Sequence, residues 1–420
     1  MSIEWIDSAA RQFKALCVRL QGELQKSNDG DLLASADAIG QQFYEQISKV
    51  QEQALQHHIE ANMGQARHRQ CSNCSRKMRH KGRSSFEFIG RFGHLHLKGI
   101  YYHCPCGQSK TVGDFVNSGR RFSFAARELA VRYAGGSSFN KAKKYLQKDF
   151  GIYVSHELLR QTTYDVGNEI KLIRDKRSHD IAWDDLAETR LYGYVDGVLV
   201  NVRQEGWKEC KLLRYDHETG NRVRYRALLG SADRFGKMVR REAMALNAQA
   251  ADEIVMLMDG ANGFHHHISR NLPDAREIND YWHACQHIGE CSAILYPKDM
   301  TQKSNWQKRY CNQLREEGPA KVLKGLRLSR KRRKYEHERE ALRLLIGYIN
   351  PRQERMNYPE LLKQNYRVDS GPVESACKNV VQARMKMPGM RWSRSGAKAM
   401  LEIRTALCSD IWEKLIKYAA

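Results

Sequence analysis

The chain has 420 residues, of which 41% are hydrophobic and 28% are charged, so it has the length and composition of a globular protein of about two to four domains. Its formal net charge of +22 indicates a polyanionic partner, with nucleic acid ahead of an anionic membrane. We expect no membrane partner, because the sequence has no apolar run of about eighteen residues and its first residues form neither a basic nor an apolar leader segment. These features predict a cytoplasmic protein that binds nucleic acid.

Residues 1–68 predict a helical region. Apolar residues recur at helical spacing from Ile6 to Leu20 and again from Phe43 to Leu55. The polar stretch "KSNDGD" separates the two helices. The sequence leaves open whether these helices pack on the rest of the chain or on a second copy of it.

Residues 69–118 predict a zinc-ribbon-like subdomain. Two cysteine pairs open and close it: Cys71, Cys74, Cys104 and Cys106. The stretch between the pairs alternates like two short strands, with a turn at Gly90–Gly93. Four thiolates at the ends of a hairpin form a tetrahedral ligand set for one structural Zn²⁺. The second pair is a tight C-x-C, so His103 is an alternative ligand, and four unligated thiols in a small β subdomain are the other alternative.

Residues 119–185 predict short helices that include a helix-turn-helix-like DNA-binding element. The stretch "YVSHELLRQTTYDVG" contains Ser155 at a helix N-cap position, and it has the character of a recognition helix. The alternative is a plain helical linker between the zinc-ribbon-like subdomain and the rest of the chain.

Residues 186–296 predict the first part of an RNase H-like core. Three strands, a helix, a buried strand, a short strand and a further helix are expected at 190–202, 207–216, 223–233, 235–247, 253–261, 276–278 and from 280 onward. This order predicts a mixed sheet inside an α+β, multidomain protein.

Residues 297–365 predict a basic helical insertion into that core. Twelve Lys or Arg residues and three Glu residues lie between Thr301 and Glu336. The densest part contains Arg330, Lys331, Arg332 and Arg333. Such a segment is either a solvated helix face or a surface that contacts phosphates, and the net charge of the chain favours DNA binding.

Three carboxylates form a candidate metal site. Asp196 in "YVDG" and Asp259 in "LMDG" each end a buried strand, and the two strands are expected to be neighbours. A carboxylate buried there without compensation is costly, and a divalent cation provides the compensation. Glu374 in "GPVESACK", within the C-terminal core helices at 366–420, would be the third ligand, with Asp369 as a competing acid. Carboxylates suit Mg²⁺ or Mn²⁺, and two such ions about 3.5–4 Å apart can catalyse in-line phosphoryl transfer.

Other polar and aromatic residues complete the predicted site. Candidates for DNA contact follow Glu374: Lys378, Arg384, Lys386, Arg391, Trp392 and Arg394. Trp392 could instead anchor its segment to the core. His283 and His287 lie four residues apart on one helix face, and His283 is a candidate for contact with the scissile phosphate, whereas His287 is expected to pack. The three histidines at 265–267 are expected to cap a helix rather than bind metal.

Several motifs together resemble one protein family. "YVDG", "MDGANGF", "INDYWHACQHIG" and above all "SGPVESACKNVVQARMKMPGMRWSRSGA" are similar to the ISKra-type insertion-sequence transposases, a DDE group. The resemblance implies a bacterial, nucleoid-associated enzyme that cleaves DNA and transfers strands at terminal inverted repeats. It also implies that Asp196, Asp259 and Glu374 form the metal-binding triad, that the partners are double-stranded end and target DNA, and that the protein works as a dimer or larger oligomer.

Two alternatives remain open from the sequence. One is an RNase H-like nuclease that cuts DNA without joining it. The other is a catalytically inactive or domesticated regulator that binds DNA through the zinc ribbon and the helix-turn-helix. Retention of all three carboxylates favours an active enzyme over a relic.

Overall fold

The computed structural model describes residues 4–25, 32–63, 70–112, 121–176, 178–259, 262–369 and 371–419. The chain forms two compact units, residues 1–163 and residues 164–419, and the boundary between them falls inside helix α5 (His156–Lys176). In the described part of the chain, no helix is both long enough and apolar enough to cross a membrane.

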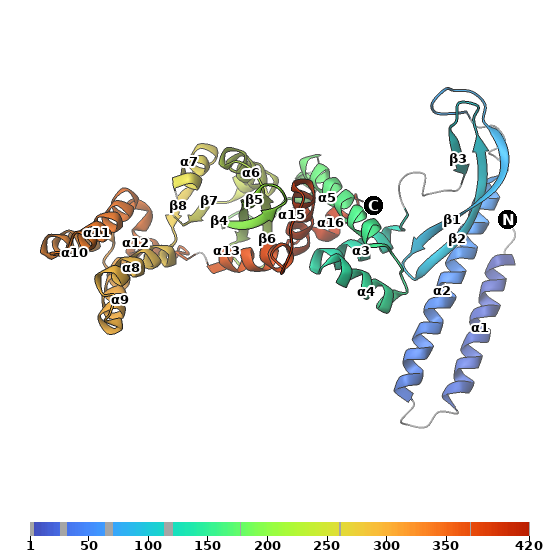
Figure 1. Cartoon of the computed structure of the whole chain (residues 1–420), viewed down its shortest axis with the longest axis horizontal. Helices are drawn as coiled ribbons and strands as arrows, with labels where there is room; N and C mark the ends of the chain where they lie inside the picture. The colour runs from blue at the N-terminus through green and yellow to red at the C-terminus, as the bar shows by residue number, and fades with distance from the viewer. Residues whose placement is uncertain are drawn as a thin grey trace. The chain divides into compact units, whose positions relative to one another are not determined.

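In the first unit, two long helices lie side by side, α1 (Glu4–Leu24) and α2 (Leu32–Met63) (Figure 1). The rings of Phe13 and Phe43 lie 5.5 Å apart across the pair. Helix α2 also covers the neighbouring sheet, where Ile59 packs on three buried side chains of the hairpin: Phe88, Leu95 and Leu97. The helices predicted for this region are therefore present: α1 packs on α2, and α2 packs on the sheet.

The sheet of the first unit has three antiparallel strands in the order β1-β2-β3. These are β1 (Arg79–Gly90), β2 (Gly93–His103) and β3 (Ser109–Val112). Strands β1 and β2 form the predicted hairpin, and Gly93 enters β2 with a φ of 130°, a conformation that glycine adopts at little cost. Strand β3 was not predicted, because it is only four residues long and follows directly on the second cysteine pair.

Three helices follow the sheet: α3 (Phe124–Gly136), α4 (Phe139–Phe150) and α5. Each begins with a serine whose hydroxyl accepts a hydrogen bond from a main-chain N–H of the first turn: Ser123 from Ala126, Ser138 from Lys141 and Ser155 from Leu158. The prediction that Ser155 is an N-cap is confirmed. Gly151 ends α4 in the left-handed conformation, with a φ of 62°.

The second unit is built on a five-stranded mixed sheet in the order β6-β5-β4-β7-β8. Its strands are β4 (Arg190–Val202), β5 (Gly206–His217), β6 (Val223–Leu228), β7 (Glu253–Met258) and β8 (Arg276–Asn279). The first three pair antiparallel, whereas β7 runs parallel to β4 and β8 runs parallel to β7. Strands β4 and β7 are neighbours at the centre, as predicted, with Val195 opposite Met258.

Helices cover both faces of this sheet (Figure 1). One face packs against α6 (Ala232–Ala245) and α7 (Asn262–Asn271) around a buried apolar core: Trp183, Val195, Leu213, Phe235, Val239, Met256 and Ile268. On the other side, α13 (Gly371–Ala376) contacts β4 and β5, and α15 (Arg394–Cys408) contacts β6. The strand that carries Asp196 therefore has an apolar core on one face and α13, the helix that carries Glu374, on the other.

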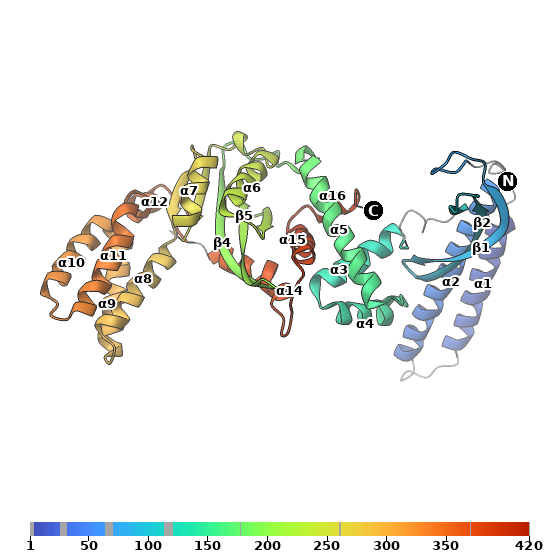
Figure 2. The ribbon, with the colours of Figure 1, turned by 45° about the horizontal axis from the view of Figure 1, so that its top comes forward.

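A group of helices follows β8. Its members are α8 (Tyr281–Leu295), α9 (Met300–Glu316), α10 (Pro319–Arg332), α11 (Glu336–Ile349) and α12 (Tyr358–Lys363) (Figures 1 and 2). Buried leucines hold the group together: Leu314, Leu323, Leu326, Leu342 and Leu345. The segment predicted as a basic helical insertion thus contains α9, α10 and α11, separated by short turns.

The C-terminal segment contains an irregular helix. Helix α13 passes into a π-helical turn, η6 (Cys377–Gln382), and then into α14 (Ala383–Met385), so the sequence from Gly371 onward is continuous but not uniformly α-helical. The indole N–H of Trp392 donates to the main-chain oxygen of Met385 over 3.1 Å, and the Trp392 side chain is 3% exposed. Trp392 therefore anchors this segment. Helix α16 (Trp412–Ile416) follows α15.

Candidate active site and zinc site

Asp196 and Asp259 lie next to each other at the centre of the five-stranded sheet. Asp196 is on β4, and Asp259 follows the last residue of β7 directly. Because Val195 pairs with Met258 in register, the next residue on each strand is an aspartate. The hydroxyl of Tyr348 donates to the main-chain oxygen of Asp259 over 3.1 Å, which attaches the insertion helices to this position.

Both carboxylate oxygens of Asp196 accept hydrogen bonds. The main-chain N–H of Gly197 donates to Oδ1 over 2.7 Å, and the thiol of Cys377 donates to Oδ2 over 3.2 Å. Burial raises the pKa of Asp196, and the negative charge of Asp259 adds to the increase. A carboxylate whose charge is disfavoured both by burial and by a second carboxylate is stabilised by a nearby cation.

His283 lies within electrostatic reach of both aspartates. Its Nδ1 is hydrogen-bonded to Oδ2 of Asp280, the residue that caps α8 by accepting from the main-chain N–H groups of Trp282 and His283 over 3.1 and 3.2 Å. This hydrogen bond raises the pKa of His283, and the charges of Asp280, Asp259 and Asp196 raise it further. The structure therefore brings His283 to the two predicted catalytic aspartates, with a cationic form favoured near them.

Glu374 lies on α13, the short helix that contacts β4. Its side chain is 69% exposed and forms an ion pair of 2.8 Å with Lys378, one helical turn further on. Lys378 lowers the pKa of Glu374, and His283 lowers it further, so the carboxylate lies close enough to His283 to be influenced by it. Glu374 thus lies on the helix that contacts the strand of Asp196, whereas the competing acid Asp369 is an exposed residue that precedes α13.

The three carboxylates provide hard oxygen donors of the kind that Mg²⁺ and Mn²⁺ prefer. They do not lie as close together as a completed ligand set, because the four cysteines are the only group of three or more described residues whose ligand atoms all lie within 4.8 Å of one another. Glu374 is turned toward Lys378, and exposed ion pairs of this kind contribute little to stability. The donor chemistry therefore fits a divalent metal site whose third ligand must leave a weak ion pair.

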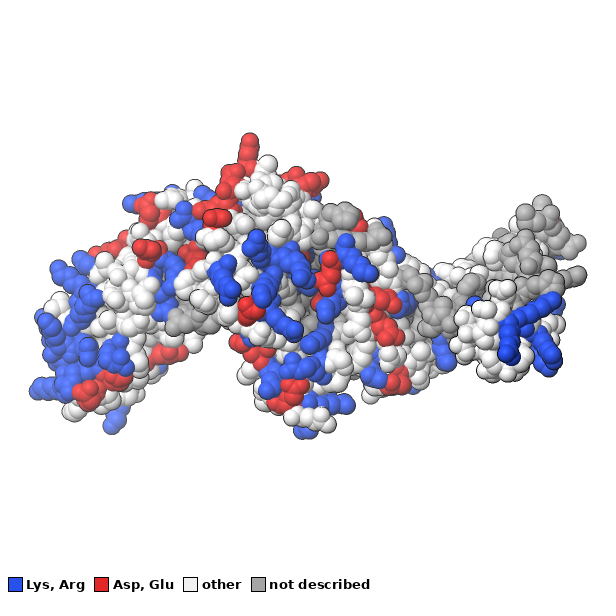
Figure 3. All heavy atoms as spheres, turned by 90° about the horizontal axis from the view of Figure 1, so that it is seen from above, with Lys and Arg blue, Asp and Glu red and all other residues white. Residues whose placement is uncertain are grey.

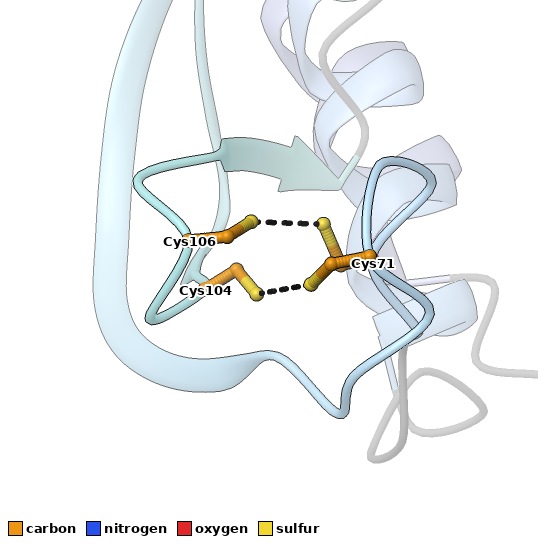
Figure 4. A group of neighbouring side chains, drawn as sticks. Cys71, Cys104 and Cys106 are labelled. Carbon is orange, nitrogen blue, oxygen red and sulfur yellow. Dashed lines mark hydrogen bonds between the residues drawn. The ribbon is translucent and has the colours of Figure 1, made fainter.

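The four predicted zinc ligands come together in the first unit. The Sγ atoms of Cys71 and Cys106 lie 3.5 Å apart, as do those of Cys74 and Cys104 (Figure 4). Each pair lies on a tight turn closed by a main-chain hydrogen bond: the N–H of Ser75 donates to Cys71 over 2.8 Å, and that of Gly107 donates to Cys104 over 2.9 Å. Ser75 and Gly107 have positive φ angles of 58° and 90°. All four thiols therefore suit one tetrahedral Zn²⁺.

The pKa values of the two thiols in the second cysteine pair are shifted in opposite directions. The main-chain N–H of Gln108 and the neighbouring thiols lower the pKa of Cys106 to about 6. At Cys104 the main-chain N–H of Cys106 also lowers the pKa, but burial and the other thiols outweigh it and raise the value to about 12. His103 is bonded instead to the hydroxyl of Ser109 over 3.0 Å, so the C-x-C spacing does not require a histidine ligand.

The predicted DNA contacts on the insertion are only partly available at the surface. Arg330, Lys331 and Arg332 are exposed in the last turn of α10. Figure 3 shows lysines and arginines gathered over the insertion helices, at the left of the view. Arg333 differs, because its guanidinium donates to the Tyr296 hydroxyl over 2.7 Å and pairs with Glu338 over 3.2 Å. Arg333 therefore connects helices rather than presenting a free charge.

The predicted DNA contacts after Glu374 require a correction. Arg384 is fully buried, with its guanidinium 4.9 Å from the ring centroid of Trp392, and neither side chain reaches the surface where DNA would lie. Both were predicted as DNA contacts from their position in a basic segment, but they are packing residues. Arg394 is partly exposed and forms an ion pair with Glu205. Lys386 and Arg391 are exposed, and Lys386 lies 5.7 Å from the ring centroid of Trp207.

The histidine predictions have different outcomes. The three histidines at 265–267 lie inside α7 rather than at its start, so the expectation that they cap a helix is wrong; His265 is bound to Glu277. His287 packs on Tyr348, with ring centroids 4.1 Å apart, as predicted. The sequence analysis missed Asp280 and Cys377 as partners of the site. Asp280 lies three residues before His283, and Cys377 lies three residues after Glu374. Residues at this spacing are neighbours on a helix, and this was the signal in the sequence that could have identified them.

Comparison with known proteins adds little to this geometry. No family model and no curated protein matches the chain. Among solved structures, the chain is similar to one described as the Drosophila P element transposase strand transfer complex, at 11% sequence identity, covering 72% of this chain and 82% of that chain with a TM-score of 0.29. A TM-score this low supports no argument about fold or function. The resemblance to ISKra-type transposases therefore remains a prediction.

Proposed function

We propose that this protein is a DDE transposase that cleaves and transfers DNA strands at the ends of an insertion sequence in a metal-dependent reaction. The observation that carries the proposal is the pair Asp196 and Asp259 on neighbouring central strands, with His283 and Glu374 within electrostatic reach. The strand order, with three antiparallel strands followed by two parallel ones, supports an RNase H-like core.

Each residue of the proposed site has a separate task. Asp196, Asp259 and Glu374 would hold the divalent ions, which supply Lewis-acid activation of the attacking and leaving oxygens. Gly197 and Cys377 fix the orientation of the Asp196 carboxylate through their hydrogen bonds. Asp280 orients His283 and favours its protonated form, which can donate a hydrogen bond to a phosphate oxygen of the DNA.

Each of the two units carries residues that we propose to bind DNA. Exposed cations on α10 and after α14 would bind phosphates near the catalytic carboxylates. In the first unit, α5 begins with exposed polar residues, Ser155, His156 and Glu157, as in a recognition helix whose N-terminal residues meet base edges. The zinc site would hold the hairpin that supports this helical group, because His94 of β2 accepts a hydrogen bond from the N–H of Tyr153 over 2.9 Å.

The proposal is tested by cleavage and joining of DNA in vitro. The purified protein is mixed with Mg²⁺ or Mn²⁺ and with duplexes that carry the inverted repeats flanking its own gene. We expect cuts at the repeat ends and joined products, and Asp196→Asn, Asp259→Asn and Glu374→Gln should each reduce cleavage by more than the roughly 100-fold that loss of an outer-shell metal partner costs. Far-ultraviolet circular dichroism of each variant serves as the folding control.

A DNA-binding regulator is the second candidate. Helix α5 and the four-cysteine group are complete without the carboxylates, and in the free protein Glu374 is paired with Lys378. Tight and specific binding to end DNA with no cutting in either metal would establish this alternative. Cutting without any joined product would instead identify a nuclease.

A further inference from the structure

A large apolar side chain next to the proposed catalytic residues is exposed. Trp282, in the first turn of α8, is 61% exposed. Three other tryptophans are buried, with exposed fractions of 1% for Trp183, 3% for Trp392 and 4% for Trp412. An indole contributes more to stability when it is buried, so an exposed one beside a reaction centre indicates a contact with something outside the folded chain.

The position of Trp282 is held rigidly. Its main-chain N–H donates to Asp280, which also binds His283, so the backbone of Trp282 belongs to the same cap as the proposed phosphate-binding histidine. Its ring lies 5.2 Å from that of Tyr281 in an edge-on arrangement, and Tyr281 in turn lies 5.4 Å from Tyr358. Tyr281 and Tyr358 are both buried. The indole is therefore supported on one side by packed aromatic rings and open on another.

The occupant of this open side follows from its location. Asp280, which accepts a hydrogen bond from the main-chain N–H of Trp282, donates its own N–H to the main-chain oxygen of Met258 over 2.8 Å, and Met258 immediately precedes Asp259. A molecule bound at the carboxylates therefore lies beside the start of α8, where Trp282 is exposed. A strand of DNA bound for cleavage is that molecule. A nucleobase can cover the whole face of an indole ring by stacking, whereas a phosphate can only accept a hydrogen bond from the indole N–H at the ring edge. A base in an intact duplex is already stacked on its neighbours, so the base that reaches Trp282 must be unpaired.

We propose that Trp282 stacks on an unpaired base beside the scissile phosphate and so positions the DNA strand for cleavage. This proposal rests on the function proposed above. Removal of base–aromatic stacking costs about 1–3 kcal/mol, which corresponds to about a 5- to 150-fold slower reaction. The site recognises a planar face rather than base edges, so it accepts any of the four bases and adds no sequence preference.

Photochemical crosslinking tests the contact without requiring catalysis. Duplexes of the inverted-repeat end carry 5-iodouracil at single positions around the cleavage site, and they are irradiated with the full-length protein in Ca²⁺. We expect a crosslink to Trp282 from one position next to the scissile phosphate, located by mass spectrometry of the digested complex. The crosslink should disappear in Trp282→Ala. A crosslink to Trp282 from no position, or one from positions far along the duplex, would overturn the proposal.

Cleavage kinetics test the consequence of the contact. Trp282→Ala should slow Mg²⁺-dependent cleavage about 5- to 150-fold while the dissociation constant for end DNA changes little, and Trp282→Phe should retain most of the rate. A substrate mismatched at the terminal base pairs should restore part of the lost rate, because the base is then already unpaired. Met244→Ala is the control, since Met244 is 64% exposed but lies on α6, away from α13 and α8.

The two sets of results separate the inference from the function on which it rests. If the wild-type protein never cleaves DNA but still crosslinks through Trp282, the transposase proposal is wrong and the base contact is supported. If Trp282→Ala cleaves at the normal rate and the wild-type protein forms no crosslink at Trp282, the base contact is wrong and the transposase proposal is supported. Equal slowing by Trp282→Ala and Met244→Ala, with no rescue by mismatches, would also refute the stacking role.

Discussion

The Cys377 thiol is bound to one of the proposed catalytic carboxylates. Cys377 follows Glu374 by three residues, and its Sγ lies 3.2 Å from Oδ2 of Asp196. The residue is 4% exposed, and burial raises the pKa of its thiol far above the ordinary value, so it remains protonated and acts as a hydrogen-bond donor. Glu374 and the residue that orients Asp196 are thus carried by one helix.

Cys377→Ala should therefore weaken metal-dependent activity. Without the thiol, Oδ2 of Asp196 loses its donor, and loss of an outer-shell partner typically costs about 10- to 100-fold in metal affinity or activity. We expect the Mg²⁺ concentration for half-maximal cleavage to rise by that factor. Cys291→Ala is the matched control, because Cys291 is also 4% exposed and creates a similar cavity on α8. An equal rise in both variants would show that the effect is structural.

Asp280 gives the site a pH dependence that can be measured on the free protein. The folded pKa of His283 lies above its unfolded value, chiefly because of the hydrogen bond to Asp280. Protonation of His283 therefore stabilises the fold; this contribution is complete below the unfolded pKa of about 6.5 and is lost as the pH rises through the folded pKa. Asp280→Asn keeps an N-capping side chain but removes the charge.

We expect Asp280→Asn to lower the free energy of unfolding more at about pH 5 than at about pH 8, on the two sides of the usual histidine range. Denaturant titrations at both pH values measure this difference. A loss of the same size at both values would mean that Asp280 acts through capping alone.

At the scale of single elements, helix α10 is the clearest candidate for phosphate binding. It is basic at its C-terminal end, where Lys331 and Arg332 are exposed, and a helix C-terminus favours cations in any case. Burial of Val322, Leu323 and Leu326 on its opposite face fixes which side chains point to solvent.

The double variant Lys331→Ala, Arg332→Ala should reduce the salt dependence of DNA binding. Each lost phosphate contact lowers the slope of log K against log[salt] by about 0.9, so we expect a decrease of nearly two. Binding should weaken equally on all DNA sequences. Arg339→Ala is the control, because Arg339 is already paired with Glu336. An unchanged slope in the double variant would mean that Lys331 and Arg332 form a solvated helix face and do not contact phosphates.

Sequence patterns predicted the elements with strong periodicity and missed those set by tertiary contacts. The hairpin of the first unit, the central strands and the N-cap at Ser155 follow from local chemistry. The strand expected at 223–233 ends at Leu228, because Ser231 caps α6 and takes the chain into a helix. The burial of Arg384 could not be predicted, since a basic segment gives no sign that it packs into the core, whereas anchoring was one of the two roles predicted for Trp392. Neither does a sequence show that Glu374 pairs with Lys378 rather than facing Asp196.

At the scale of the whole molecule, the division into two units predicts two unfolding transitions. The four-cysteine group lies in the unit of residues 1–163, whereas six of the seven tryptophans lie in the unit of residues 164–419. Tryptophan fluorescence therefore reports mainly on the second unit, and far-ultraviolet circular dichroism reports on both.

Cys71→Ser should abolish zinc binding and selectively destabilise the first unit. Zinc binding to small structural sites releases on the order of 10 kcal/mol, so its loss should move the first transition well below the second. The fluorescence transition should stay in place. Cys17→Ser, at an exposed cysteine of α1, should keep both the metal and both transitions. A fluorescence transition that falls together with the zinc content would contradict the independence of the two units.

The π-helical turn from Cys377 to Gln382 makes the length of this segment as important as its composition. Each residue of an α-helix turns the chain by about 100° and advances it by about 1.5 Å. The end of the segment is fixed by buried Met385 and Trp392, so removal of one residue from the turn would convert it to an α-helix and rotate Glu374 away from the sheet edge. Substitutions at exposed Lys378 or Asn379 would leave that direction unchanged. In cleavage assays, single-residue deletions in this turn should therefore abolish activity, whereas substitutions at its exposed positions should retain it. The register of the helix, rather than the identity of its residues, sets where the third carboxylate points.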